Sequence, residues 1–311
     1  QKLGELYHTA WTFQDGAPAE IHALAQTTDG FLWLGTATGL FRFDGIRFET
    51  YKPESGKAFP QRNVVSLFAV PDGGLWVGYW YGGVSFVKNG TVTDYGEPEG
   101  LPSHAVLAFA RDGEGAIWIA AGNDGLARLE GSRWRKIGSD WGFEGPANTV
   151  FGDHAGTIWV GTPTSVAHLV SGANQFHIAA QGLRRVNNLA ESPDGTLWMA
   201  ETSYGVRPVP LPSKNNGRPA PTIFVGSQAM AFDSQGGLWV TTLGSGIRRV
   251  SYPERLHQSQ TPGPSAWQYH SSELEALTEQ DGLTSDYVNC VLQDREVTPV
   301  VETLSLDEAY L

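Results

Sequence analysis

A Leu-Trp or Ile-Trp pair recurs six times along the 311 residues, and this recurrence constrains the fold more than any other feature. The tryptophans are separated by 43, 42, 41, 39 and 41 residues; they are Trp33, Trp76, Trp118, Trp159, Trp198 and Trp239. A fixed period of about 20–50 residues is the signature of a repeat architecture. The chain is therefore a repeat protein.

Each repeat carries the same small residues around its tryptophan. A glycine three residues before it marks a turn; these glycines are Gly30, Gly73, Gly115, Gly156, Gly195 and Gly236. A small residue two positions after it allows a neighbouring backbone to approach. The second unit reads as four short strands, around "VVSLF", "LWVG", "VSFV" and "VTDYG", joined by turns. Without helical periodicity, this predicts an all-β fold, a β-propeller of four-stranded antiparallel blades with tryptophans packed between blades.

The two ends of the chain are out of phase with the repeat. The first residues, "LYHTAWTFQDGAPAE", match the fourth strand and exit loop of a blade, and "YVNCVLQDRE" begins a seventh unit. We predict six complete repeats plus part of a seventh, with the last blade closed by the N-terminal strand so that no sheet edge stays open. A six-bladed ring remains the alternative. The predicted propeller domain covers residues 1–296, and residues 297–311 form an atypical tail that is not a domain, because no further Leu-Trp pair follows Glu296.

Composition limits the partners that such a chain can have. Lys and Arg total 21 against 33 Asp and Glu, a net charge of −12 with no basic patch, which disfavours nucleic acid and contact with anionic membranes. The single cysteine, Cys290, excludes an intrachain disulfide and is expected in a core strand. No window reaches the roughly 20 apolar residues of a membrane span. No signal peptide is visible, so the sequence allows export without showing it.

Residues 8–296 resemble the two-component regulator propeller repeat. The likeness rests on "IHALAQTTDGFLWLGTATGLFRFDGIRFETY", "SLFAVPDGGLWVGYWYGGVSFVKNG" and the exit phrases "DGAP", "EGLP" and "DGLT". In that family the propeller is the periplasmic sensory part of membrane-bound hybrid histidine kinases or diguanylate cyclases. The resemblance implies a non-catalytic sensor fragment located outside the cytoplasm, whose parent protein is anchored in the bacterial inner membrane.

The tail "TPVVETLSLDEAYL", about residues 298–311, resembles a different family, the Y-family DNA polymerases, around their active-site segment. In that resemblance Asp307 and Glu308 match carboxylates that hold magnesium. The chain has no room for the rest of such an enzyme. We interpret the tail as the product of a frameshift or gene fusion, with chance likeness as the alternative.

Loops at one mouth of a propeller form its default ligand site. In the second repeat, Tyr79, Trp80 and Tyr81 replace the "TAT" of the first, which favours a platform for a sugar face or an apolar ligand. The alternative is a loop that simply packs on its neighbour.

Two further groups fall on equivalent loops. In the fifth repeat, Arg184, Arg185, Glu201 and Tyr204 suit an acidic saccharide or a carboxylate, with solvated rim charges as the alternative. In the third repeat, His104 and Asn123 are weaker candidates that could instead satisfy loop backbone groups.

No catalytic motif appears, and we predict no catalytic residue, metal or cofactor. Asp153 and His154 are expected to form the turn before Trp159. The leading hypothesis is a sensory module that binds a small molecule, a glycan or a partner protein. A propeller lyase similar to the streptogramin B lyases is an alternative, because their repeats also carry a glycine turn before a tryptophan; an interaction scaffold is another. A homodimer is left open.

Overall fold

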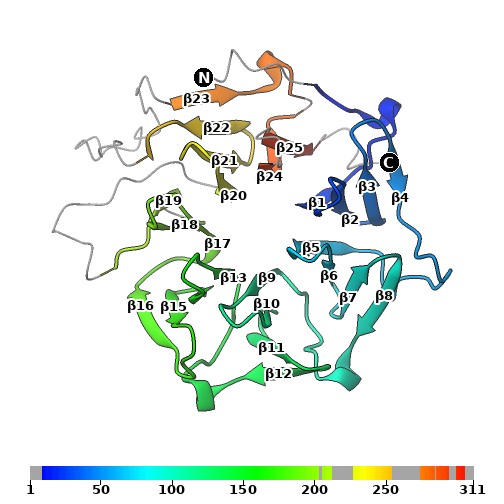
Figure 1. Ribbon diagram of the computed structural model, residues 1–311. Coiled ribbons are helices and arrows are strands. Elements are labelled where there is room, and N and C mark those ends of the chain that lie inside the picture. Colours follow the sequence, from blue (N-terminus) through cyan, green and yellow to red (C-terminus); the bar gives the residue numbers. More distant parts are fainter. Residues whose placement is uncertain are drawn as a thin grey trace. The chain divides into compact units, whose positions relative to one another are not determined.

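The computed structural model describes residues 9–202, 205–211, 227–253, 274–283, 285–293 and 299–304. The chain divides into two compact units, Trp11–Ile178 and a second unit formed by Gln1–Ala10 with Ala179–Leu311. Each repeat lies on its own antiparallel sheet, whose strands pair in chain order (Figure 1). We number these sheets as blades along the chain. The fold class is confirmed: the protein is all-β, a β-propeller of four-stranded antiparallel blades.

The first unit contains blades 1–4. Their strands are β1 (Ile21–Gln26), β2 (Leu32–Thr36), β3 (Gly39–Phe43) and β4 (Phe48–Thr50); β5 (Val64–Ala69), β6 (Leu75–Tyr79), β7 (Val84–Lys88) and β8 (Thr91–Tyr95); β9 (Ala108–Arg111), β10 (Ile117–Ala120), β11 (Leu126–Glu130) and β12 (Arg133–Ile137); and β13 (Thr149–Gly152), β14 (Ile158–Gly161), β15 (Ser165–Leu169) and β16 (His177–Gln181). The division between the two units falls within β16.

The second unit contains the remaining sheets. Blade 5 has the described strands β17 (Val186–Glu191), β18 (Leu197–Glu201) and β19 (Gly205–Pro208); blade 6 has β20 (Ser227–Phe232), β21 (Leu238–Thr242), β22 (Ile247–Val250) and β23 (Leu274–Leu277); and β24 (Tyr287–Gln293) pairs with β25 (Pro299–Leu304). The backbone of the atypical tail thus adds a strand beside β24, in antiparallel register from Gln293↔Pro299 to Tyr287↔Leu304. The predicted N-terminal closing strand (residues 1–8), Asp307 and Glu308 lie outside the described residues, so seven-bladed closure and the division at residue 296 stay predictions.

The turn glycines and the small residues after the tryptophans have the conformation and the close contact that the repeat predicts. The six turn glycines before the tryptophans all have positive φ, from 76° at Gly195 to 93° at Gly30, a conformation that favours glycine. At the small position after Trp33, a Cβ on Gly35 would lie 2.6 Å from Val64 Cγ1 of blade 2. Neighbouring blades therefore touch at this position.

Short 3₁₀ helices lead into the exit phrases, at Phe13–Asp15, Glu97–Glu99 and Glu279–Asp281, and a fourth occupies the equivalent place after blade 3, at Ser139–Trp141. Each ends on a glycine in the left-handed region. No helix in the described part of the chain is long and apolar enough to cross a membrane.

Within each unit, repeat tryptophans pack into the core between neighbouring sheets. Trp118 is fully buried with Ile158 and Val160 of blade 4, and Trp76 packs with Phe109 and Ile117 of blade 3. Such burial stabilises the fold by about 25 cal/mol per Å² of apolar surface removed from water. Cys290 is buried on β24, which confirms its prediction as a core strand residue.

Candidate functional site

The loop after β6 presents two aromatic side chains to solvent. Trp80 is 50% exposed and Tyr81 is 71% exposed, whereas Tyr79, the last residue of β6, is fully buried. The turn is closed by Gly82 and Gly83, both with positive φ, which lets the chain reverse directly after the two rings. Large aromatic side chains exposed on a tight turn are available for contact with a ligand.

The connection before β5 fixes the backbone of this loop. The Gln61 side-chain amide donates to the carbonyl oxygens of Tyr81 at 3.1 Å and Gly82 at 2.7 Å, and the Trp80 amide donates to the Asn63 carbonyl at 3.0 Å. The aromatic rings are therefore carried on a backbone that is held at several points. A preordered loop loses less entropy when it binds.

Tyr79 supports the loop from inside the sheet. Its hydroxyl donates to Ser85 Oγ at 2.8 Å, because the Ser85 hydroxyl proton is directed to Asp94 Oδ1 at 2.6 Å. Lys57 Nζ completes this chain with a 2.6 Å ion pair to Asp94 Oδ2. Burial raises the pKa of Tyr79 far above its ordinary value, so the phenol stays neutral. We therefore assign Tyr79 to support of the platform, in place of direct ligand contact.

Blade 3 adds a histidine and an acid beside the same loop. His104 Nδ1 lies 2.7 Å from Asp124 Oδ2, and the His104 backbone amide donates to that oxygen at 3.1 Å. Burial opposes ionisation of Asp124, but these hydrogen bonds outweigh it and hold the pKa of the carboxyl below its usual value. Asn123, next to Asp124, is exposed.

The blade 2 and blade 3 groups lie against each other. A Cβ on Gly82 would come within 2.6 Å of the carbonyl oxygen of Ser103, the residue before His104. The structure therefore brings Trp80, Tyr81 and His104 into one loop cluster.

The Gln61–Asn63 segment contributes polar groups that sequence reasoning did not select. Gln61 Oε1 and Asn63 Oδ1 are buried and have no hydrogen-bond partner among the described residues. Between them Arg62 is exposed, and its side chain makes no hydrogen bond or ion pair to the described part of the chain. Buried carbonyl oxygens are rarely left unpaired, so this position suits a hydrogen-bond donor from water or a ligand. In the sequence, this segment is the end of the "FPQRN" stretch that connects blade 1 to blade 2.

In the other unit, the predicted blade 5 residues surround a buried carboxylate. Glu201 has no exposed surface; Arg207 donates to Glu201 Oε2 through Nε at 2.8 Å and Nη2 at 2.6 Å, and the Arg184 amide donates to Oε1 at 2.8 Å. Arg184 and Arg185 have exposed side chains, and Arg185 is held at a φ of 46°. Glu201 thus positions the arginine backbone. Tyr204 lies outside the described residues.

Metal ligation has no prepared site in the part of the chain that the structure describes, where no three His, Cys, Asp or Glu side chains come together. Asp153 does form its predicted turn, because its Oδ1 accepts from the amides of Ala155 and Thr157. It also accepts from the Trp159 indole at 2.8 Å, a role that the sequence analysis missed.

Comparison with known structures bears on the fold. The extracellular domain of the hybrid two-component system BT4673 from B. thetaiotaomicron is 17% identical with a TM-score of 0.70, and the similarity covers 92% of this chain and 37% of that one. PorZ, a surface component of the type-IX secretion system of Porphyromonas gingivalis, is 16% identical with a TM-score of 0.66 over 92% of this chain and 46% of its own. The chain shares the fold of these bacterial surface domains. It spans less than half the length of either.

A third similar structure is an enzyme. Virginiamycin B lyase from Staphylococcus aureus is 13% identical, with a TM-score of 0.62 over 78% of this chain and 86% of its own. No model of a known protein family matches the chain, and no curated protein sequence matches it. At these identities the similarities establish the propeller fold, which agrees with the repeat resemblance found in the sequence.

Proposed function

We propose that the chain is the ligand-sensing propeller of a two-component signal-transduction protein. The observation that carries the proposal is the exposed Trp80–Tyr81 pair on a braced turn, next to an exposed guanidinium and two unpaired carbonyl oxygens. The similarity to an extracellular domain of a hybrid two-component system supports the same assignment.

The residues of the loop cluster define the ligand in chemical terms. The aromatic rings suit an apolar or sugar face, Gln61 Oε1 and Asn63 Oδ1 accept hydrogen bonds, and Arg62 attracts a negative group. A small molecule or glycan with a flat face, hydroxyl or amide donors and an acidic substituent fits these groups; a partner protein is the alternative. In the other unit, Arg184 and Arg185 are proposed as a separate contact surface for an acidic group, with the Arg184 backbone held by Glu201.

The parent protein follows from the same proposal. The propeller lies outside the cytoplasm, does no chemistry itself, and passes ligand occupancy to a histidine kinase anchored in the bacterial inner membrane. The similar BT4673 domain is longer than this chain, which covers 37% of it, so further domains are expected in the parent.

The test is a thermal-shift screen of glycans and small acids on the full chain, followed by titration of any hit against variants. We expect Trp80→Ala to weaken binding about tenfold to thirtyfold, as for a central aromatic contact, and Arg62→Ala to weaken only acidic ligands. Phe13→Ala is the matched control, because Phe13 is an aromatic that is 76% exposed on a different loop. Unchanged affinity in Trp80→Ala would remove the platform from the proposal.

A lyase is the second candidate, because the His104–Asp124 pair offers a proton acceptor beside the aromatic loop. Incubation with virginiamycin B, with and without added magnesium, tests it by mass spectrometry of the products. Turnover abolished by His104→Ala would establish an enzyme in place of a sensor.

A further inference from the structure

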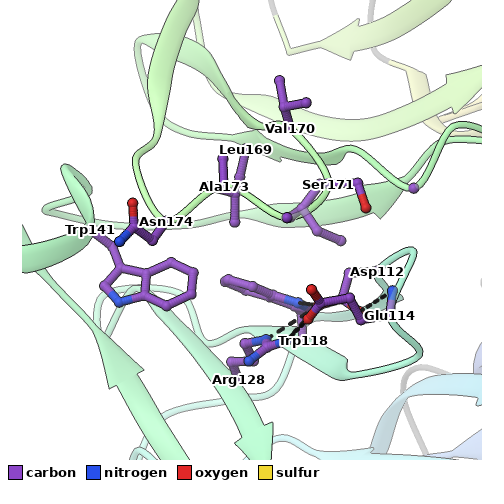
Figure 2. A pocket seen from close by; sticks show the side chains of 13 residues that line it. Asp112, Glu114, Trp118, Arg128, Trp141, Leu169, Val170, Ser171, Ala173 and Asn174 are labelled. Atoms are coloured by element: carbon purple, nitrogen blue, oxygen red, sulfur yellow. Dashed lines mark hydrogen bonds and ion pairs between the residues drawn. The ribbon is translucent and has the colours of Figure 1, made fainter.

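A cavity of about 200 Å³ lies between blades 3 and 4, at the end of β10 opposite the aromatic loop cluster (Figure 2). Its floor is formed by Trp118, Ile158 and Leu169, all buried. The connection from β15 to β16 covers it, through Val170 to Asn174. Figure 2 shows Trp141 and Asn174 at one end of this cavity and Asp112 and Glu114 at the other.

The polar end is organised around Asp112, whose two oxygens are fully used. Oδ1 accepts from the amides of Glu114 and Ala116, and Oδ2 accepts from Trp118 Nε1 at 2.8 Å and from Arg128 Nε and Nη2 at 3.2 Å each. Asp112 therefore has no capacity for a ligand. Glu114 is different: its side chain is 63% exposed, and Arg128 contacts only its Oε2, at 3.0 Å. Its Oε1 has no hydrogen bond or ion pair within the described part of the chain.

The charges around the cavity do not balance. The connected ion pairs contain four carboxylates but only the two guanidinium groups of Arg128 and Arg135; the acids are Asp112, Glu114, Glu130 and Asp140. Among the residues that line the cavity, only Asp112, Glu114 and Arg128 are charged, so the lining carries one net negative charge. An anionic ligand is disfavoured here, and a cation is favoured.

The rest of the cavity surface is apolar or aromatic. Trp141 packs edge-on against Trp118, with ring centroids 5.8 Å apart, and is only partly buried. Val170 beside the opening is 52% exposed. The guanidinium groups of Arg128 and Arg135 lie 5.7 and 5.5 Å from the ring centroids of Trp118 and Trp141, so both rings already have a cationic neighbour. The apolar walls accept the short carbon stem that carries an ammonium or guanidinium group.

We propose that this cavity binds a small organic cation, an ammonium or guanidinium group on an apolar stem of a few carbons. The stem lies against Trp141 and Val170, and the cationic head pairs with Glu114. The volume is below the about 300–1,000 Å³ of sites for drug-sized ligands, so the cavity holds one such group. The group can come from a free amine or from a Lys or Arg side chain of a peptide.

The probes are agmatine and phenethylamine for a free amine, and an Arg-containing tripeptide, blocked at both ends, for a side chain. Binding to the full chain is followed by calorimetry and by ligand-observed NMR. We expect at least one probe to bind with a Kd between about 10 µM and 1 mM, and to bind more weakly at high salt. Tighter binding of the tripeptide than of agmatine identifies a peptide as the source; the reverse identifies a free amine.

The decisive variants are Glu114→Gln, which removes the exposed charge, and Ala173→Leu, which fills the cavity and leaves every charge in place. Each should weaken binding at least fivefold, and Glu144→Gln, an exposed glutamate outside the cavity, should leave it unchanged. Thermal midpoints of all variants confirm folding. The proposal is overturned if no cationic probe binds, if Glu114→Gln has no more effect than Glu144→Gln, or if glucose binds as tightly as the amines.

Discussion

Blades 3 and 4 build the same cluster with different basic residues. In each, a turn aspartate accepts the tryptophan indole N–H at 2.8 Å, Asp112 from Trp118 and Asp153 from Trp159. Directly across the strand pair lies Arg128 in blade 3 and His168 in blade 4. One residue type at one repeat position therefore separates the two clusters.

Arg128 and His168 make different interactions because only the arginine carries a permanent charge. Arg128 bonds Asp112 and reaches Glu114 and Glu130, so the cluster extends outward to the cavity. The His168 ring instead stacks on Trp159 at 5.0 Å, and its Nδ1 is buried without a partner in the described residues. Burial and the neighbouring His177 lower the pKa of His168, although Asp153 opposes this shift. The two repeats thus keep the same packing around the tryptophan, while the residue opposite it differs in charge.

Removing the turn aspartate should give the largest difference in stability between the two clusters. We expect Asp112→Ala to lower the free energy of unfolding by about 2–4 kcal/mol, because it removes the acceptor of an indole N–H and two amides and one of the three carboxylate partners of Arg128. Asp153→Ala should cost about 1–3 kcal/mol, since no arginine depends on it. Urea unfolding measures both.

The control for this pair is Asp72→Ala in blade 2, whose carboxylate is 61% exposed and pairs with Lys88. Exposed pairs contribute about 0–1 kcal/mol. If Asp112→Ala and Asp153→Ala lower the free energy of unfolding by the same amount, Arg128 adds no stability to the blade 3 cluster, and the two clusters do not differ in the way described.

Replacing Arg128 with histidine should make the stability of blade 3 depend on pH. We expect Arg128→His to lose about 1–3 kcal/mol at pH 8, where the imidazole is neutral and Asp112 loses its charged partner. Asp112 and Glu114 should raise the pKa of that imidazole above its unfolded value of about 6.5. The stabilisation is then fully present below that value and is lost as the pH rises through the folded pKa.

Thermal midpoints between pH 5 and pH 8.5 test the exchange. The midpoint of Arg128→His should approach that of the wild type on acidification. A constant difference across the range would show that Arg128 acts through packing of its carbon stem on Trp118, where its guanidinium lies 5.7 Å from the ring centroid.

The blades were predictable because their signals are local and repeated. Gly30 and its equivalents require a left-handed turn, and the tryptophans supply the apolar position of the following strand, so sequence spacing alone defined the sheets. The Asp-Trp bond also has a sequence signal: an aspartate stands six residues before Trp118, Trp159 and Trp239. Only Asp153 was predicted, and only as a turn residue.

The sites were less predictable because they depend on which side chain is buried. Tyr79, Trp80 and Tyr81 are alike in sequence, yet Tyr79 ends a strand inside the sheet and the other two lie beyond it. From sequence alone Glu201 resembles a solvated rim charge, whereas in the structure it is fully buried and paired with Arg207, six residues later. The cavity needs two sheets to form, and no single repeat encodes it.

The smallest expected effect is the acid sensitivity of blade 4. Because the pKa of His168 is lowered in the folded state, protonation favours unfolding; the stability from its neutral ring is present above about pH 6.5 and is lost as the pH falls below it. The effect on the thermal midpoint should be about 1–3 °C between pH 7.5 and 5.5, because the ring is only partly buried.

The chain has 8 histidines, so His168→Gln must be compared with the wild type over this range. His168→Gln should flatten the profile, and His177→Gln, which removes only the repulsion, should flatten it partly. A profile unchanged in His168→Gln would mean that His168 titrates as an ordinary surface histidine, and that blades 3 and 4 differ in shape but not in charge.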